Sequence, residues 1–193
     1  MAQNQRLVIG ISGASGAVLG IRLLEACRKL DLETHLVISK AGEITIAQET
    51  NRSVSEVRAL ASHTHKSADI GAAIASGSYP TMGMAVVPCS IRTMSEIATG
   101  VTSSLLTRAA DVTLKERRKL LLAVRETPFH TGHLRTLTQL SEMGAIIAPP
   151  VPAFYTKPET TAEIVDQFTG HLLRLMGIDN DLAREWTGLK GGA

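Results

Sequence analysis

The stretch LVIGISGASGAVLGIRLLEACRK, residues 7–29, decides the fold class of this 193-residue chain. Residues 7–12 form a short, mostly apolar run that is typical of a buried strand, and residues 18–29 form an apolar stretch that favours helix. The glycines between them, Gly10, Gly13 and Gly16, predict a tight turn. A strand, a tight turn and a helix in this order indicate an α/β protein.

Four further apolar runs repeat the strand pattern, at residues 34–39, 84–88, 120–124 and 145–148. Helical patterns fall at residues 42–49, 94–98, 105–115, 134–143 and 162–176. Strands that are apolar throughout and alternate with helices predict a doubly wound, mostly parallel sheet, a three-layer sandwich of flavodoxin-like or Rossmann-like type. Residues 51–80 are less regular. We expect one domain over residues 1–193, with residues 179–193 as a C-terminal arm.

Composition excludes several classes of protein. Lysine and arginine total 20 against 18 acidic residues, with no basic run, which argues against a nucleic-acid partner. The apolar runs are far shorter than the roughly 20 residues of a membrane span, and the polar N-terminus does not resemble a secretory signal. Two cysteines predict no disulfide framework, so we expect a cytoplasmic protein. No cluster of histidine or cysteine ligands stands out, which predicts no metal.

Small polar residues follow the predicted strands, where a parallel sheet gathers its ligands. The turn after the first strand lets backbone amides approach an anion at the next helix, with the Ser15 hydroxyl beside them. Its spacing departs from the dinucleotide fingerprint, and packing alone explains such a turn equally well. Ser39 follows the second strand. The segment PCSIRT, residues 88–93, follows the third, where Ser90 taken alone is a helix cap.

Reactive and charged residues have competing interpretations. Cys89 is a poor candidate nucleophile, because no histidine is near it in sequence and a thiol at a buried strand end is usually inert. Arg125 and Glu126 follow the fourth strand, either in the ligand crevice or as a solvated ion pair. Arg108 and Lys115 lie on one helical stretch, which is either a wet face or part of a phosphate clamp.

Taken together, these segments resemble one family along nearly the whole chain. The matching motifs are GISGASGA, ETHLVISK, QET at residues 48–50, SGS at residues 76–78, PCSIRT, LLTRAADVTLKERR, VRETPFHTGHL and PPVPAFY. On these motifs the chain resembles the flavin prenyltransferases, the UbiX-like family formerly described as aromatic acid decarboxylases.

The resemblance implies a flavodoxin-like fold that binds FMN, whose ring accepts a dimethylallyl group from dimethylallyl monophosphate. The product, prenylated FMN, would then be the cofactor of a UbiD-type decarboxylase in ubiquinone synthesis or in decarboxylation of hydroxyarylic acids. The resemblance also implies a metal-independent reaction and a homo-oligomer, in this family a dodecamer. The small residues and the 3% aromatic content of the chain are compatible with close packing between subunits.

The resemblance also assigns site residues by position. The matches to FMN-binding positions are Gly13, Ala14, Ser15, Ser39, Cys89, Ser90, Ile91, Arg92 and Arg125. The matches to the positions that hold the allylic phosphate are Arg108, Lys115 and Tyr155, and the reacting centre is lined by Glu49, Glu126 and Trp186. Glu49, Lys115, Glu126 and Ser15 are the expected catalytic residues. The family's arginine on the last helix is His171 here, and Arg174 lies one helical turn away.

Two alternative functions remain open at this point. A flavin-dependent cysteine decarboxylase of the same fold typically carries an asparagine in a PASANT-like segment, and PCSIRT has none. A non-catalytic accessory subunit that carries flavin to a decarboxylase would not need Glu49, Lys115, Arg125 and Glu126.

Overall fold

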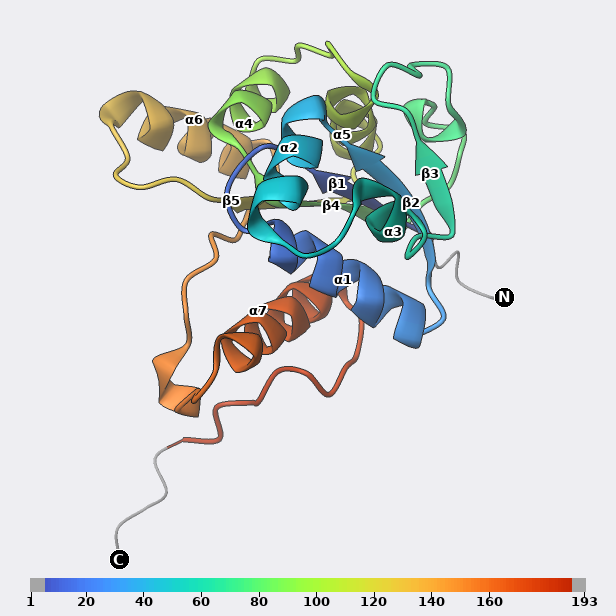
Figure 1. The fold of residues 1–193 in the computed structure, drawn as a ribbon. Coiled ribbons are helices and arrows are strands. Elements are labelled where there is room, and N and C mark those ends of the chain that lie inside the picture. Colours follow the sequence, from blue (N-terminus) through green and yellow to red (C-terminus); the bar gives the residue numbers. More distant parts are fainter. Residues whose placement is uncertain (1–5, 189–193) are drawn as a thin grey trace, which may run out of the picture.

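The sheet is the centre of the molecule. The computed structural model describes residues 6–188. It contains strands β1 (Arg6–Ile11), β2 (Glu33–Ile38), β3 (His63–His65), β4 (Gly83–Cys89), β5 (Lys119–Val124) and β6 (Ile146–Ile147). They form one six-stranded sheet in the order β3-β2-β1-β4-β5-β6, and every neighbouring pair is parallel (Figure 1).

The predicted doubly wound sheet is confirmed, and its strand order is that of the Rossmann type. Five strands coincide with predicted runs. The sixth, β3, lies inside the irregular region 51–80 and was missed. Its sequence is His-Thr-His, polar and largely exposed at the sheet edge, so it carries no apolar pattern.

Helices cover both faces of the sheet, as Figure 1 shows, with α1 and α7 below it and α4 and α5 above it. The helices are α1 (Ala17–Lys29), α2 (Lys40–Glu49), α3 (Val54–Arg58), α4 (Ile91–Ala98), α5 (Leu105–Lys115), α6 (Thr131–Glu142) and α7 (Thr161–Met176), and the 3₁₀ turns are η1 (Ala73–Ala75) and η2 (Phe154–Thr156). Within residues 6–188, none of these helices is both long and apolar enough to cross a membrane.

Alternation along the strands divides the apolar core in two. Leu7, Ile9 and Ile11 of β1 pack with the buried residues of α1 and α7, whereas Val8 packs with those of α4 and α5. This is the period of two expected for a strand that is covered on both faces.

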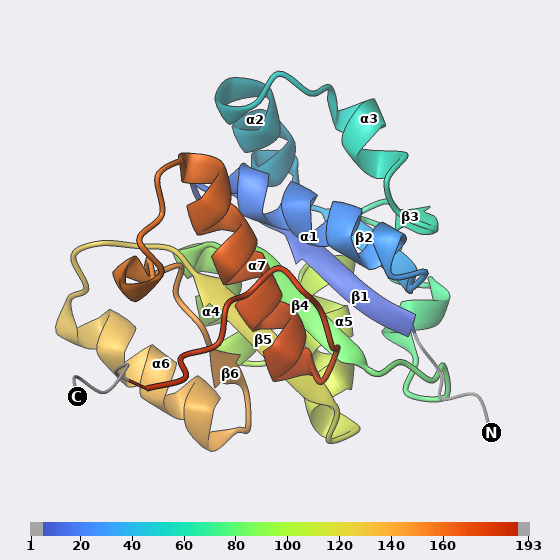
Figure 2. The same cartoon turned by 90° about the horizontal axis from the view of Figure 1, so that it is seen from below.

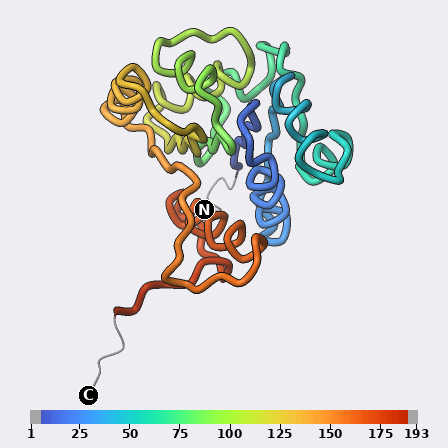
Figure 3. Tube along the Cα trace, turned by 60° about the vertical axis from the view of Figure 1, so that its left-hand side comes forward, coloured from blue at the N-terminus to red at the C-terminus, as the bar shows by residue number. Residues whose placement is uncertain are grey.

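Helix α7 packs against α1 at the end of a long extended connection that leaves β6 (Figures 2 and 3). The residues after α7 run back along it: the Arg184 amide donates to Gln167 Oε1 at 2.8 Å, and Ala183 is buried. The first part of the expected arm, up to Arg184, therefore lies against α7, whereas residues 185–188 are exposed and residues 189–193 are outside the described part of the chain.

Ser12 joins the loops that follow the neighbouring strands β1 and β4. Its buried hydroxyl donates to the Pro88 carbonyl at 3.0 Å and accepts from the Ser90 amide at 2.8 Å. The connections that follow these two strands lead away in opposite directions. A doubly wound sheet opens its ligand crevice between two such strands. Ser12 thus sets the spacing of the two loops that border the crevice.

Gly20 allows α1 to lie close to β4. A Cβ atom at this position would come within 2.2 Å of the Val87 carbonyl oxygen. We expect Gly20→Ala to lower the free energy of unfolding by about 1–3 kcal/mol, because the helix must move off the sheet. Gly71→Ala is the control, since its Cβ would meet only Asp69 Oδ1 at 3.8 Å. Urea denaturation of both variants measures the effect, and equal stabilities would contradict the close packing.

Candidate active site

Glu49 links the end of α2 to the start of α1. Its Oε2 accepts hydrogen bonds from the amides of Gly16 at 2.8 Å and Ala17 at 3.0 Å. Partial burial acts to raise the pKa of Glu49, but hydrogen bonds from Ser15 and the two amides, with the charge of Arg125, outweigh it and hold the pKa below its ordinary value. The carboxylate is therefore ionised and caps the positive end of α1.

This contact corrects one expectation from the sequence. The amides at the start of α1 were expected to receive an anion from a ligand, but those of Gly16 and Ala17 already bind Glu49. A phosphate placed there would also face the ionised carboxylate at close range. The glycine turn is thus completed by a side chain of the protein, and a ligand phosphate needs another place.

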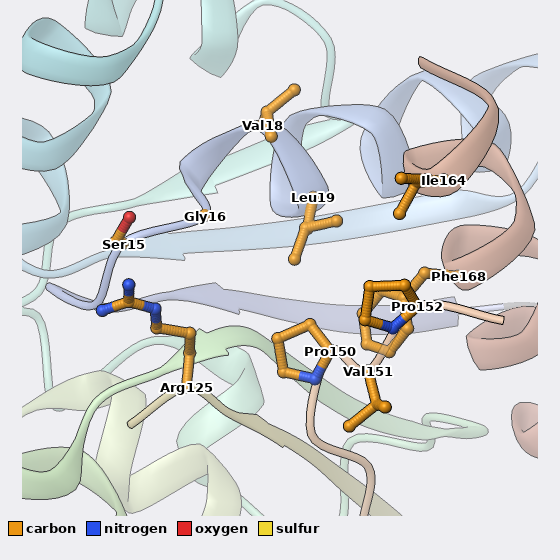
Figure 4. A pocket seen from close by; sticks show the side chains of 10 residues that line it. All are labelled: Ser15, Gly16, Val18, Leu19, Arg125, Pro150, Val151, Pro152, Ile164 and Phe168. Carbon is orange, nitrogen blue, oxygen red and sulfur yellow. The ribbon is translucent and has the colours of Figure 1, made fainter. Parts of the chain in front are cut away.

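An apolar cleft begins beside this turn. It has a volume of about 250 Å³, and Figure 4 shows its lining: Ser15, Gly16, Val18, Leu19, Arg125, Pro150, Val151, Pro152, Ile164 and Phe168. In this view Arg125 extends towards the Ser15–Gly16 turn, while Leu19, Pro150, Ile164 and Phe168 gather away from it. One end of the cleft is therefore cationic and the remainder is apolar.

A second cavity of about 250 Å³ continues this cleft along α7. The two share Val151, Pro152, Ile164 and Phe168, and the second adds the polar side chains of Tyr155, Gln167 and His171. Trp186 packs edge-on against Tyr155, with ring centroids 5.4 Å apart. The combined cleft has polar groups at both ends and an apolar middle.

A separate cavity of about 450 Å³ is rich in hydroxyl groups. Its lining comprises Gly13, Ser39, Lys40, Ala41, Ser67, Ala68, Ser90, Arg92, Thr93, Glu96, Ser103, Ser104, Leu106 and Thr107. Ser39, Ser90 and Ser104 are the N-caps of α2, α4 and α5, so three helices begin at this cavity. Helix N-termini and hydroxyl donors together favour an anion.

Gly13 connects the glycine turn to this cavity. A Cβ atom at Gly13 would lie 2.3 Å from Ala41 Cβ, so the turn approaches the first residues of α2 as only glycine permits. Ser39 and Ser90 accept from the amides of Gly42 and Thr93, which confirms the capping role considered for Ser90. Arg92, with 83% of its side chain exposed, pairs with Glu96 at 2.8 Å.

Two residues of the predicted set, Cys89 and Ala14, are buried. Cys89 is fully buried, and burial raises the pKa of its thiol far above the ordinary value. The low expectation for a Cys89 nucleophile is therefore confirmed in its physical basis. Ala14 is also buried, whereas Ile91 is partly exposed at the start of α4.

The predicted cations Arg108 and Lys115 lie away from the cleft. Arg108 binds the Ala75 carbonyl at 3.2 Å and Asp111 at 2.6 Å. Lys115 pairs with Glu116 near the start of β5, whereas Arg125 follows the end of that strand, roughly 20 Å along it. One chain therefore does not bring Lys115 to Arg125.

Of the other predicted residues, some line the cleft and others do not. Glu126 is half-buried and accepts from the neighbouring Thr127 amide at 2.9 Å, outside the cleft lining. His171 lines the cavity with Tyr155, but Arg174 does not: it binds the Ala183 carbonyl and lies 3.8 Å from Glu185. Of the two candidates on α7, the structure places His171 at the site.

Sequence reasoning missed two contributions. The sequence pattern gives Ser12 no role beyond the end of a strand and the glycine turn, although a serine that closes an apolar run at the carboxyl end of a strand is a recognisable signal. The apolar floor formed by Leu19, Pro150 and Phe168 comes from three distant segments, and no local pattern indicates it.

Comparisons with known proteins agree with this geometry. Residues 1–173 match the model of the Flavoprotein family. The chain is 54% identical over 187 residues to the flavin prenyltransferase UbiX of Salmonella typhimurium, covering 95% of this chain and 99% of the relative.

Solved structures agree as well. AnUbiX (PadA1), in complex with FMN and dimethylallyl pyrophosphate, is 45% identical with a TM-score of 0.95 over 97% of this chain and 100% of that one. The dodecameric FMN-dependent UbiX-like decarboxylase of Escherichia coli O157:H7 is 47% identical with a TM-score of 0.93, over 95% of this chain and 100% of that one.

The fold and the cleft thus define a flavoprotein of doubly wound α/β architecture. Within that class the chain belongs to the UbiX family of flavin prenyltransferases, which confirms the resemblance inferred from the motifs. The cysteine decarboxylase alternative is not favoured: TvaF, an enzyme of that kind, is only 16% identical with a TM-score of 0.62, over 76% of this chain and 90% of that one, which shows a shared fold alone.

The cap that Glu49 forms on α1 makes a pH-dependent prediction. Because the pKa of Glu49 is lowered in the folded state, its stabilisation is present above its ordinary pKa of about 4.5 and is lost as pH falls through the lower folded value. We expect Glu49→Gln to reduce the free energy of unfolding by about 0.5–1 kcal/mol near pH 7.

The difference between wild type and Glu49→Gln should shrink as pH falls through the folded-state pKa of Glu49, because protonation removes the charge that distinguishes the two side chains. Urea unfolding at pH 7, 5 and 3 measures it. A difference that does not vary with pH would show that the carboxylate charge contributes nothing to the cap.

Proposed function

We propose that this chain transfers a dimethylallyl group from dimethylallyl monophosphate to reduced FMN and releases prenylated FMN. The observation that carries the proposal is the cleft, whose apolar middle suits an isoprenoid group and whose ends offer Arg125 on one side and Tyr155 with His171 on the other. AnUbiX, which shares the fold at 45% identity, is described with FMN and dimethylallyl pyrophosphate.

FMN fits the residues present at the crevice. The hydroxyl-rich cavity would hold its phosphate through Ser39 and Ser90, and the exposed Arg92 would exchange its ion pair with Glu96 for the phosphate. The ring would extend past the Ser12 junction towards Arg125. When bound, FMN supplies the carbon and nitrogen nucleophiles that accept the prenyl group.

The side chains of the cleft would position the allylic substrate. Leu19, Ile164 and Phe168 contact its hydrocarbon part and exclude water, which strengthens electrostatic interactions inside the cleft. The Tyr155 hydroxyl and His171 would hold the phosphate as charge develops on its bridging oxygen. Trp186, packed on Tyr155, provides an electron-rich face near the same end.

Carboxylates are available for the proton that leaves when the new ring closes. Glu49 lies beside Ser15 and is ionised, so its carboxylate can stabilise a positive charge on a nearby group or accept a proton. Glu126 follows Arg125 in the loop after β5 and is the second candidate base.

Arg108 and Lys115 fit this reaction only from another copy of the chain. Within one chain Lys115 lies at the far end of β5, yet a phosphate leaving group benefits from fixed cations. The relative from Escherichia coli O157:H7 is dodecameric. We therefore propose a homo-oligomer, in this family a dodecamer, in which Lys115 and Arg108 of one copy complete the cleft of a neighbour.

The product would pass to a UbiD-type decarboxylase as its cofactor. A cytoplasmic location fits this role, and it also fits Cys27 and Cys89, which are both buried and unpaired. A subunit that only carries flavin would need one cavity for that flavin. The apolar cleft beside the hydroxyl-rich cavity would then have no role.

Mass spectrometry of extracted flavin tests the proposed function. Purified protein incubated anaerobically with reduced FMN and dimethylallyl monophosphate should yield flavin heavier by one prenyl unit, and the yield should not change after treatment with a chelator. Unmodified flavin that stays bound would instead identify a carrier.

Exchange between copies makes a prediction for Lys115. We expect Lys115→Ala and Tyr155→Phe each to fold, bind FMN and lose at least about tenfold in prenylation rate. Oligomers reassembled from a mixture of the two variants should recover part of the activity, because some clefts then combine an intact Tyr155 with an intact Lys115. A mixture with no more activity than either variant would place Lys115 outside the site.

His171 makes a prediction about substrate affinity. It lines the end of the cleft together with Tyr155, where the phosphate of the substrate would lie. We expect His171→Ala to raise the Michaelis constant for dimethylallyl monophosphate about tenfold, because a hydrogen bond to a charged group is lost. His171→Arg, which keeps a side chain that binds phosphate, should restore most of the affinity. Arg174→Ala serves as the comparison and should leave the Michaelis constant nearly unchanged, since Arg174 binds Ala183; the reverse pattern would transfer the phosphate contact to Arg174.

A further inference from the structure

A cluster of histidines lies at the edge of the sheet, at the amino ends of β2 and β3. Strands β2 and β3 are neighbours at this edge (Figure 1). Glu33 and His35 alternate along β2, and His63 and His65 alternate along β3, whose register pairs His35 with His63. Residues two apart on a strand face the same side of the sheet, so all four side chains share one face. The expectation that no such cluster exists is therefore wrong.

Three of these residues have the spacing of metal ligands. Glu33 Oε1 lies 3.2 Å from His35 Nε2 and 3.4 Å from His63 Nε2, and the three ligand atoms are all within 4.8 Å of one another. Ligands at 2.0–2.1 Å from a tetrahedral ion are separated by roughly 3.3–3.4 Å. We propose that Glu33, His35 and His63 bind one divalent transition-metal ion, for which Zn²⁺ is the best match.

Neighbouring groups hold two of these ligands in orientation. His35 Nδ1 lies 3.0 Å from His65 Nε2, and Glu33 Oε2 accepts from Arg6 Nε at 3.0 Å. These contacts use His35 Nδ1 and Glu33 Oε2, which leaves His35 Nε2 and Glu33 Oε1 to bind the metal. Metal ligands are commonly oriented by such hydrogen bonds to their other polar atom. The Tyr79 hydroxyl, 3.1 Å from His35 Nε2, is the group that an ion would displace.

The cluster is open on one side. The His35 side chain is 4% exposed, whereas those of Glu33 and His63 are 36% and 54% exposed. An ion can therefore enter from solvent, bind one buried ligand and keep water in its remaining position. Among the charged groups at this edge, Arg6 pairs with Glu33 and Asp69 lies close enough to His65 to act on it.

The site is remote from the proposed reaction. Glu33 begins β2 and Ser39 follows its end, roughly 20 Å away along the strand. A bound ion would tie the three-residue edge strand β3 to β2 and have no part in prenyl transfer. Its ligands come from both strands, so binding requires the native pairing.

Calorimetric titration of the full chain with Zn²⁺, after removal of metals with a chelator, tests the proposal. We expect about one ion per chain, and no binding of Mg²⁺, which prefers oxygen ligands. Co²⁺ should give the visible absorption of a tetrahedral site. His63→Ala removes an exposed ligand without opening the core, and Glu33→Gln keeps the shape of its side chain. Each should weaken Zn²⁺ binding at least about tenfold.

His133→Ala is the matched control, because His130 and His133 form the other close histidine pair, with ring centroids 3.6 Å apart. It should leave Zn²⁺ affinity unchanged. The proposal is overturned if wild type binds no Zn²⁺, if binding survives both cluster variants, or if His133→Ala abolishes it. Prenylation activity is not part of this test, so its result is independent of the proposed function.

Discussion

The junction made by Ser12 is the constraint on which the functional region depends. β1 and β4 lie side by side at the centre of a parallel sheet, and the chain leaves them in opposite directions. A single buried hydroxyl ties the two departing loops together through the Pro88 carbonyl and the Ser90 amide. Because both loops border the crevice, the glycine turn, the start of α4 and the hydroxyl-rich cavity take their relative positions from this contact.

The helices that begin at the crevice differ in what their first amides face. Helix α1 begins at the glycine turn, but its first amides are occupied by Glu49, which places a carboxylate where a nucleotide-binding sheet often receives phosphate. Helices α2, α4 and α5 begin at a separate cavity lined with hydroxyls. Separating the two regions leaves an ionised side chain next to the proposed reacting centre and keeps it away from the proposed flavin phosphate.

The proposed active centre depends on packing at long range. Its apolar floor comes from α1, the connection after β6 and α7, and its cations are divided between the end of β5 and the start of that strand. The cleft of one chain ends at Tyr155 and His171 with Lys115 out of reach. Under the proposed exchange between copies, an oligomer brings together residues that lie at opposite ends of one sheet.

The sequence by itself determined the sheet class, five of the six strands and the residues that follow them, because buried parallel strands are apolar and their loops carry glycine and small polar residues. It also contained the motifs of the family. It did not reveal β3, since three polar residues at a sheet edge are held by backbone pairing with β2 and carry no apolar signal.

Only the tertiary structure decided which of the candidate residues meet. Glu49 caps a helix that begins 32 positions earlier, and His35 meets His63 across 28 residues of sequence through strand register. His171 reaches the cleft while Arg174, less than one turn further along, is bound to the segment after α7. Such choices depend on the direction of a side chain relative to its neighbours, and sequence spacing along one element does not specify them.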